Sequence, residues 1–185
     1  MTKTTNTEPA AWIGCLSCYN NGTLRARWIT AQQAADEQTG DDEPSYRGQA
    51  ETVTIDDYTA PRCRKCGGDE FDVFDTEHLP TKMNVREFYE NAAHLAYIEA
   101  DELERLTVLG QWRQMTLAEL IAYDDTNYCG QWDTFQEYVE HFADATSALR
   151  DMPENLAYYF DYEKYARDLA YSYLYDDATG HTWFT

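Results

Sequence analysis

The hydrophobic pattern of the 185-residue chain changes its period near residue 83. Before this point, short apolar runs are separated by turn residues, as in β-structure. After it, apolar residues recur at i, i+3, i+4 and i+7, as in amphipathic helices. Such separation of strands from helices along a chain is typical of an α+β fold. We predict three small domains: a β-rich domain over residues 1–79, a small helical domain over 80–124, and an α+β domain over 125–185.

The N-terminal part contains the signals of a β-hairpin. Two short runs, residues 11–19 and 24–29, flank the tripeptide Asn20-Asn21-Gly22, and an Asn-Gly step favours a tight turn between antiparallel strands. Residues 53–55 and 71–74 are predicted to form two further strands. The polar, turn-rich stretch 38–50 is predicted to be an exposed loop or insertion.

Three segments after residue 83 predict amphipathic helices, each with four apolar residues on one face. These residues are Val85, Phe88, Tyr89 and Ala92; Phe135, Tyr138, Val139 and Phe142; and Tyr162, Tyr165, Ala166 and Leu169. Asp133 and Asp161 precede the second and third segments and are predicted N-caps. The aromatic runs 171–175 and 181–184 flank Gly180 and suit a closing hairpin.

The net charge of −20 is distributed unevenly along the chain. Residues 1–66 carry seven Lys/Arg against nine Asp/Glu, whereas residues 67–185 carry seven against 25. This balance argues against direct binding to nucleic acid, which needs Lys and Arg to neutralise phosphates. It favours a partner with a basic surface, although the solubility of an ordinary acidic protein is an alternative explanation.

The predicted helix over 133–145 carries its acidic residues on one outer face. Glu137, Glu140 and Asp144 are three and four residues apart, and like charges at this spacing cost a few tenths of a kcal/mol per pair. One explanation is imitation of a DNA duplex, which carries one negative charge per roughly 1.7 Å of axis. On that scale, a charge of −20 matches about 34 Å of duplex, and a dimer matches about twice that length. A solvated acidic face is the alternative.

The sequence contains no pattern typical of an enzyme active site. There is no H-E-x-x-H motif, no G-x-G-x-x-G or Walker-type loop, and no histidine beside a serine or cysteine motif. Adjacent acidic pairs such as Asp124-Asp125 arise freely in so acidic a chain, so we predict a protein that is not an enzyme. The sequence also shows no signal peptide and no apolar run of membrane-spanning length, which predicts a cytoplasmic protein that does not bind membranes.

Two C-x-x-C pairs, Cys15/Cys18 and Cys63/Cys66, carry the strongest chemical signal. Disulfides are uncommon in the cytoplasm, so the pairs suggest a metal site, and Cys63-Arg-Lys-Cys66-Gly-Gly has the form of a zinc-ribbon knuckle. The predicted ligands of a structural Zn²⁺ are these four cysteines. The nearby side chains of Arg62, Arg64 and Lys65 would offset the charge of a Zn(Cys)₄ centre. Alternatively, the first pair belongs to the core and the second to an exposed loop, and Cys129 stands alone.

Four phrases of the sequence, in this order, resemble the ArdA family of antirestriction proteins. They are CLSCYNNGTLRARWI (15–29), EFDVFDTE (70–77), YCGQWDTFQEYVE (128–140) and, the most specific, MPENLAYYFDYEKYARDL (152–169). The resemblance implies an elongated, dimeric, three-domain α+β protein whose carboxylates imitate DNA phosphates. It further implies a homodimer, carried by phages or conjugative elements, that occupies the DNA-binding groove of type I restriction-modification enzymes in the host bacterial cell. The second C-x-x-C pair and the insertion before it depart from the family pattern.

The predicted function lies in a distributed face of carboxylates, none of which is essential alone. The predicted residues are Glu99, Asp101, Glu102, Glu104, Glu119, Asp124, Asp125, Glu137, Glu140, Asp144, Asp151 and Glu154. The first four are the nearest candidate for the family's short acidic antirestriction motif. Two other classes stay open: an acidic zinc-ribbon interaction module or regulator that binds another basic DNA-binding protein, and an enzyme with a metal-bound carboxylate centre.

Overall fold

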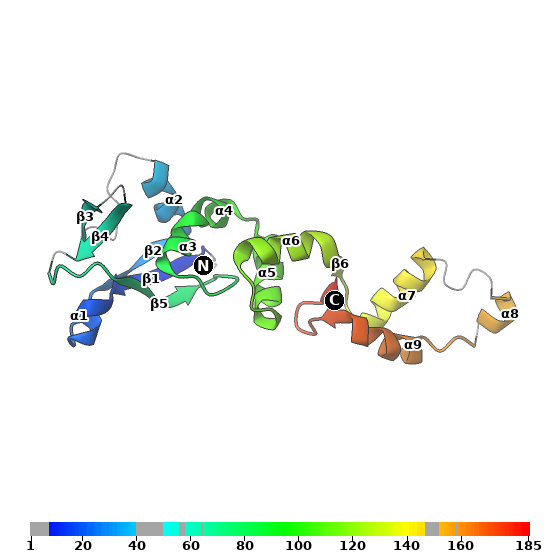
Figure 1. Cartoon of the computed structure of the whole chain (residues 1–185). Helices are drawn as coiled ribbons and strands as arrows, with labels where there is room; N and C mark the ends of the chain where they lie inside the picture. The colour runs from blue at the N-terminus through cyan, green and yellow to red at the C-terminus, as the bar shows by residue number, and fades with distance from the viewer. Residues whose placement is uncertain (1–7, 40–49, 56–57, 64, 147–151, 158) are drawn as a thin grey trace, which may run out of the picture. The chain divides into compact units, whose positions relative to one another are not determined.

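The structure, a computed structural model, contains both helices and strands and confirms the α+β class (Figure 1). It describes residues 8–39, 50–55, 58–63, 65–146, 152–157 and 159–185. The chain divides into two compact units, Met1–Leu117 and Ala118–Thr185. The predicted boundary at residue 79/80 lies within the first unit, and the division into three domains stays a prediction.

The first unit contains a three-stranded antiparallel sheet in the order β2-β1-β5. Its strands are β1 (Ala10–Cys15), β2 (Ala26–Thr30) and β5 (Phe71–Glu77). Ala11, Ile13 and Ile29 are almost completely buried, which places them on the core face of the sheet. On the other face, Trp12 stacks on Trp28 with ring centroids 6.3 Å apart. The sheet therefore buries its aliphatic residues on one side and carries aromatic residues on the other.

The predicted pairing of the first two strands is confirmed, and Asn21 and Gly22 lie in a turn, but the connection is longer than the tight turn that was expected. The connection contains a short helix, α1 (Leu16–Asn20), and Gly22 follows it with a φ of 75°. The helix begins at Cys15, whose Sγ accepts a hydrogen bond from the backbone N–H of Cys18 at 3.4 Å. The spacing of Cys15 and Cys18 therefore fits the first turn of a helix, which the Asn-Gly step alone did not indicate.

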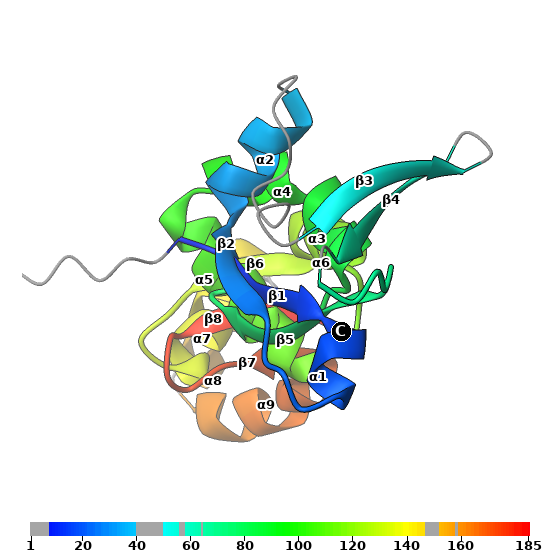
Figure 2. The same ribbon diagram turned by 90° about the vertical axis from the view of Figure 1, so that its left-hand side faces the viewer.

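Residues 31–63 differ in part from the sequence-based expectation. Helix α2 (Ala31–Thr39) and strand β4 (Tyr58–Cys63) were not predicted, and the predicted strand at 53–55 is the end of β3 (Ala50–Ile55). β3 and β4 pair as a separate two-stranded antiparallel ribbon, visible in Figure 2. The expected loop over 38–50 overlaps the end of α2 and the first residue of β3, and its remainder, 40–49, lies outside the described residues.

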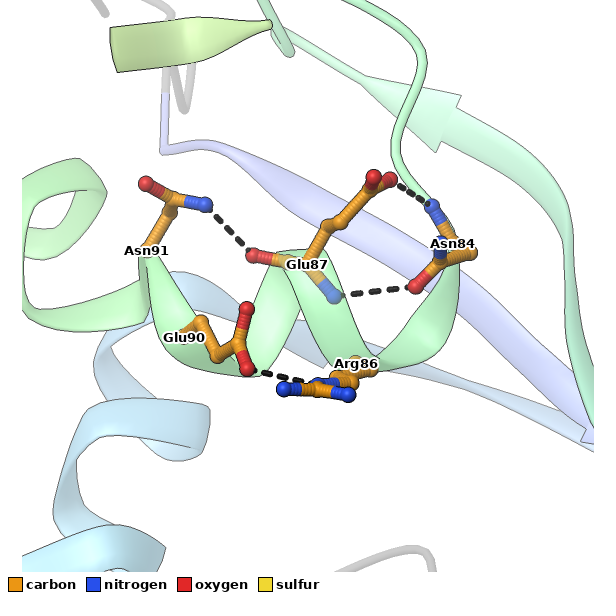
Figure 3. Close-up of polar contacts among 5 residues, drawn as sticks. All are labelled: Asn84, Arg86, Glu87, Glu90 and Asn91. Carbon is orange, nitrogen blue, oxygen red and sulfur yellow. Dashed lines mark hydrogen bonds and ion pairs between the residues drawn. The ribbon is translucent and has the colours of Figure 1, made fainter.

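The helix expected over residues 85–92 is interrupted at Asn91. Helix α3 (Val85–Glu90) starts with a reciprocal capping box, in which Asn84 accepts from the N–H of Glu87 and Glu87 accepts from the N–H of Asn84 (Figure 3). The Asn91 side chain donates to the carbonyl of Glu87 at 2.7 Å. It closes α3 before α4 (Ala92–Tyr97) begins, and α4 packs on α2. The predicted apolar positions Phe88 and Ala92 are buried, but they lie in two short helices where one continuous helix was predicted.

Two longer helices follow in the chain, α5 (Ala100–Trp112) and α6 (Leu117–Asn127). In α5, the buried residues Leu103, Leu106 and Leu109 recur every three residues, which forms one apolar stripe. Leu117 and Leu120 are the buried residues at the start of α6. Among the described residues, no helix combines the length and the apolar character that crossing a membrane requires.

The second unit packs helices against a small antiparallel sheet in the order β6-β8-β7. Its elements after α6 are β6 (Tyr128–Gln131), α7 (Phe135–Ala145), α8 (Glu154–Ala157), α9 (Tyr162–Leu169), a 3₁₀ turn (Ala170–Ser172), β7 (Tyr173–Tyr175) and β8 (His181–Phe184). The predicted closing hairpin is confirmed as β7–β8, and β6 is an addition. Helix α7 packs on α9, where Tyr138, Val139 and Ala166 form the buried cluster.

One of the two predicted N-caps is correct. Asp161 accepts a hydrogen bond from the N–H of Lys164 at 2.9 Å and caps α9. The prediction for α7 is wrong by one residue, because Thr134 rather than Asp133 accepts from the N–H of Glu137, at 3.1 Å. The carboxylate of Asp133 is therefore not used to cap this helix.

Candidate functional site

Helix α7 presents the acidic face that its sequence predicted. Tyr138, Val139 and Ala143 are buried on its inner side. Glu137, Glu140 and Asp144 are exposed on the other side, and the helix contains no Lys or Arg. A rise of 1.5 Å per residue places these three carboxylates within about 10.5 Å of helix axis. The helix therefore displays a row of negative charge in water, held in place by a packed apolar face.

Neutral donors orient two of these carboxylates without cancelling their charge. The amide of Gln136 donates to Glu140 at 2.8 Å, and the backbone N–H of Asp133 donates to Glu137 at 3.2 Å. The second contact lies at the positive end of the helix dipole, which stabilises a carboxylate. Neither donor is a cation, so neither contact forms an ion pair with the carboxylate.

Further carboxylates that the sequence analysis did not select lie close to the start of α7. The hydroxyl of Tyr175 donates to the carbonyl of Asp133 at 3.2 Å. Burial raises the pKa of Tyr175, and the negative charges of Asp177, Asp133, Asp176 and Glu137 raise it further. Four carboxylates from the β7–β8 turn and from the start of α7 thus act together on one phenol. The sequence signal that could have identified these carboxylates is the pair Asp176-Asp177, which lies close to Gly180 in the turn between the two aromatic runs.

Two of the candidates in α5 have a basic side chain beside them, Arg105 for Asp101 and His94 for Glu102. Asp101 accepts from Arg105 at 2.8 Å, and this hydrogen bond and the positive charge lower the pKa of its carboxyl group. Glu102 lies 3.5 Å from the Nε2 atom of His94. The other exposed candidates are Glu99, Glu104, Glu119 and Asp125. The part of α5 that the antirestriction motif would occupy is therefore acidic, but less purely so than α7.

Three of the predicted carboxylates are not among the exposed side chains that the structure describes. Asp124 is 5% exposed and accepts a hydrogen bond from the indole N–H of Trp183, so its assignment to the surface is wrong. Asp151 lies outside the described residues. Of Glu154, only the backbone, which begins α8, is described. The structure brings Glu137, Glu140 and Asp144 together and removes Asp124 from the face.

The four cysteines of the two C-x-x-C pairs meet in the first unit. Cys15 ends β1, Cys18 lies in α1, Cys63 ends β4 and Cys66 lies in the turn that follows. Their Sγ atoms all lie within 4.8 Å of one another, close enough to hold a metal ion. Cys66 is exposed and the other three are buried. Cys129 is not part of this group, since its thiol donates to the carbonyl of Asn127.

The backbone around Cys63 forms a tight knuckle. The N–H of Cys63 donates to the carbonyl of Gly68, and the N–H of Gly67 donates to the carbonyl of Cys63, both at 2.7 Å. Gly67 has a φ of 70°, a conformation that glycine adopts without strain. Burial opposes ionisation of Cys63, but hydrogen bonds from the N–H groups of Cys66 and Lys65 lower the pKa of its thiol to about 6. The knuckle therefore stabilises a thiolate.

The basic residues expected beside the cysteines are only partly visible. Lys65 is exposed within the knuckle. Arg64 lies outside the described residues, and the side chain of Arg62 is not described.

Burial raises the pKa of Cys18 to about 12, the opposite direction to that of Cys63. Within the cluster, burial therefore opposes ionisation of Cys18, whereas backbone N–H groups favour ionisation of Cys63.

Comparison with known proteins agrees with the resemblance found in the sequence. A search of curated proteins finds no significant match. The model of the family described as "Antirestriction protein (ArdA)" matches residues 11–181, which is nearly the whole chain. The match includes both C-x-x-C pairs and helix α7. The chain therefore belongs to the ArdA family of antirestriction proteins.

Proposed function

We propose that this antirestriction protein inhibits type I restriction-modification enzymes by occupying their DNA-binding groove with a surface that imitates B-form DNA. The observation that carries the proposal is the outer face of α7. Glu137, Glu140 and Asp144 are exposed there in one row, without Lys or Arg in the helix. Membership of the ArdA family supports the antirestriction class.

The charge of the second unit supports a role in binding a basic groove. Residues 118–185 contain 14 Asp/Glu and three Lys/Arg, a net charge of −11. The α7 carboxylates follow one another at about 5 Å along the axis. This is of the same order as the 3.4 Å per phosphate along one DNA strand. A groove built to neutralise phosphates would therefore attract this helix by the same kind of interaction.

The proposed inhibitor acts by occupancy and not by catalysis. A phosphate mimic repels nucleic acid itself, so the partner is the enzyme and not its DNA. The target enzyme acts on DNA in the bacterial cytoplasm, which places the inhibitor there. We also propose a homodimer, which doubles the net charge and the length of duplex that can be imitated.

A competition assay tests the proposal. Purified full-length protein is added to a type I methyltransferase bound to fluorescent duplex DNA, and release of the DNA is measured while salt is varied. We expect stoichiometric displacement that weakens with salt, because both ligands depend on screened charges. Displacement that continues at far below one inhibitor per enzyme would instead indicate catalysis. Failure to displace DNA at any salt concentration would reject mimicry.

The second candidate is an acidic zinc-ribbon module that binds another basic DNA-binding protein. The cluster of Cys15, Cys18, Cys63 and Cys66 favours this alternative. Substitution of the cysteines separates the two functions: the mimic keeps its inhibition because α7 lies in the other unit, whereas the zinc-ribbon module loses its binding. Full DNA displacement by the substituted protein would support mimicry.

A further inference from the structure

The geometry points to a tetrathiolate Zn²⁺ centre, formed by Cys15, Cys18, Cys63 and Cys66, that fastens the knuckle after β4 to the junction of β1 and α1. This inference goes beyond the proposed function, because none of the ligands lies on the acidic face. It is carried by the arrangement of the four sulfur atoms and by the backbone that surrounds them.

The distances between the sulfur atoms suit one tetrahedral ion. A Zn–S bond of about 2.3 Å requires the sulfur atoms of a regular tetrahedron to lie about 3.8 Å apart. Cys15 Sγ lies 3.5 Å from Cys66 Sγ, and Cys18 Sγ lies 3.6 Å from Cys63 Sγ. All four atoms lie within 4.8 Å of one another. A small adjustment of the side chains is therefore sufficient for coordination.

The two pairs interleave, because each of the short contacts joins one C-x-x-C motif to the other. This arrangement gives every sulfur a neighbour from the opposite motif, as a shared ion requires. Among the described residues, the cluster consists of four sulfur ligands, a set that selects a soft ion and is typical of structural Zn²⁺. With four protein ligands, no position stays open for a substrate, so the centre is structural.

Backbone N–H groups and a glycine hold the two motifs in place. The N–H of Cys18 points at Cys15 Sγ, and the N–H of Leu16 donates to the carbonyl of Glu70 at 3.0 Å. A Cβ atom at Gly68 would lie 2.7 Å from Ser17 Oγ and 3.3 Å from Cys66 Sγ. Only a residue without a side chain lets the knuckle approach α1 this closely. This close approach of the knuckle to α1 brings the thiols of Cys63 and Cys66 to those of Cys15 and Cys18.

The apolar surroundings of the cysteines are small. Among the described residues, the buried cluster consists of Cys15, Cys18 and Cys63, with Phe71 packed against it. Small domains with little core of their own commonly use a metal ion for stability. Zn²⁺ would supply that stability here, and its loss would release residues 63–70 from α1 without affecting the second unit.

The first test measures metal on the full-length protein. After purification under reducing conditions, elemental analysis is expected to find a single Zn²⁺ per chain. Replacement by Co²⁺ is expected to give the visible d–d bands and the thiolate charge-transfer bands of tetrahedral coordination by sulfur. Wild-type protein that retains no zinc and gives no such Co²⁺ spectrum would overturn the inference.

Variants identify the ligands. Cys66→Ser is expected to lose the bound zinc on gel filtration, whereas Cys129→Ser, the control outside the cluster, keeps it. Cys66→His retains a ligand at the exposed corner, so it is expected to bind Co²⁺ with a spectrum shifted towards three sulfur atoms and one nitrogen. That shift is unaffected by any loss of packing, because it reports the coordinating atoms directly. An unchanged spectrum in Cys66→His, or equal zinc loss in Cys129→Ser, would contradict the assignment.

Discussion

The indole Nε1 of Trp183 donates a hydrogen bond to Asp124 Oδ1 at 2.7 Å, and both residues are buried. Trp183 lies in β8 and Asp124 in α6, so this contact joins the helix to the central strand of the β6-β8-β7 sheet. This carboxylate, which the sequence analysis selected for DNA mimicry, is therefore part of the core of the second unit.

Asp124→Ala is expected to lower the free energy of unfolding of the second unit by about 1–3 kcal/mol, since it leaves a buried indole N–H without its acceptor. The matched control is Asp125→Ala, at an exposed neighbour, with an expected change within about 0.5 kcal/mol. Native-state amide hydrogen exchange in β8 measures both changes. Equal effects of the two substitutions would show that the Trp183 contact adds no stability.

The N-cap of α7 gives a second prediction. Thr134→Ala is expected to destabilise the second unit by about 1 kcal/mol, because it removes the acceptor for the N–H of Glu137. Asp133→Ala keeps that acceptor and is expected to change stability much less. Urea denaturation of both variants, followed by circular dichroism, compares them. A larger loss in Asp133→Ala would restore the sequence-based assignment.

Elements determined by local patterns could be predicted from the sequence. The spacing of Tyr138, Val139 and Phe142 depends only on the helical period, and the pairing of residues 11–14 with 26–29 depends on two apolar runs that are close in the sequence. The same holds for the Asp161 cap. The acidic face of α7 was predictable for this reason, because once the apolar stripe is located, the outer positions follow.

Features that depend on distant residues could not be predicted. The burial of Asp124 requires Trp183, which is 59 residues away in the chain. The carboxylates that surround Tyr175 come from two segments that only the folded sheet brings together. Strand β6 is short, contains Gly130, and pairs with β8, the last strand of the chain. At the start of α7, two adjacent residues are both good caps, and only the backbone geometry decides between them.

Glycine substitutions test the packing of the closing hairpin. Gly180 and Gly22 have similar backbone angles, with φ of 78° and 75°, but different surroundings. A Cβ atom at Gly180 would collide with the carbonyl oxygen of Trp132, whereas no atom lies within 4 Å of one at Gly22. Gly180→Ala is expected to lower the free energy of unfolding by more than about 2 kcal/mol, and Gly22→Ala by about 1 kcal/mol. Thermal unfolding monitored by hydrogen exchange in each unit measures the difference, and equal costs would indicate that only the backbone angle matters.

Neutralising the acidic face of α7 tests whether mimicry is distributed over several carboxylates. Each single change, Glu137→Gln, Glu140→Gln or Asp144→Asn, is expected to weaken displacement of DNA from the methyltransferase less than about tenfold, because exposed charges contribute about 1 kcal/mol or less each. In the triple variant, displacement of DNA is expected to weaken more than about tenfold. Its displacement is also expected to depend less steeply on salt, because fewer charges are screened. A control neutralises three exposed carboxylates of the first unit: Asp69, Asp72 and Asp75. If the control variant displaces DNA as weakly as the α7 triple variant does, inhibition depends on net charge and not on the acidic face of α7. If one single change abolishes inhibition while circular dichroism shows an intact fold, the protein uses a discrete site.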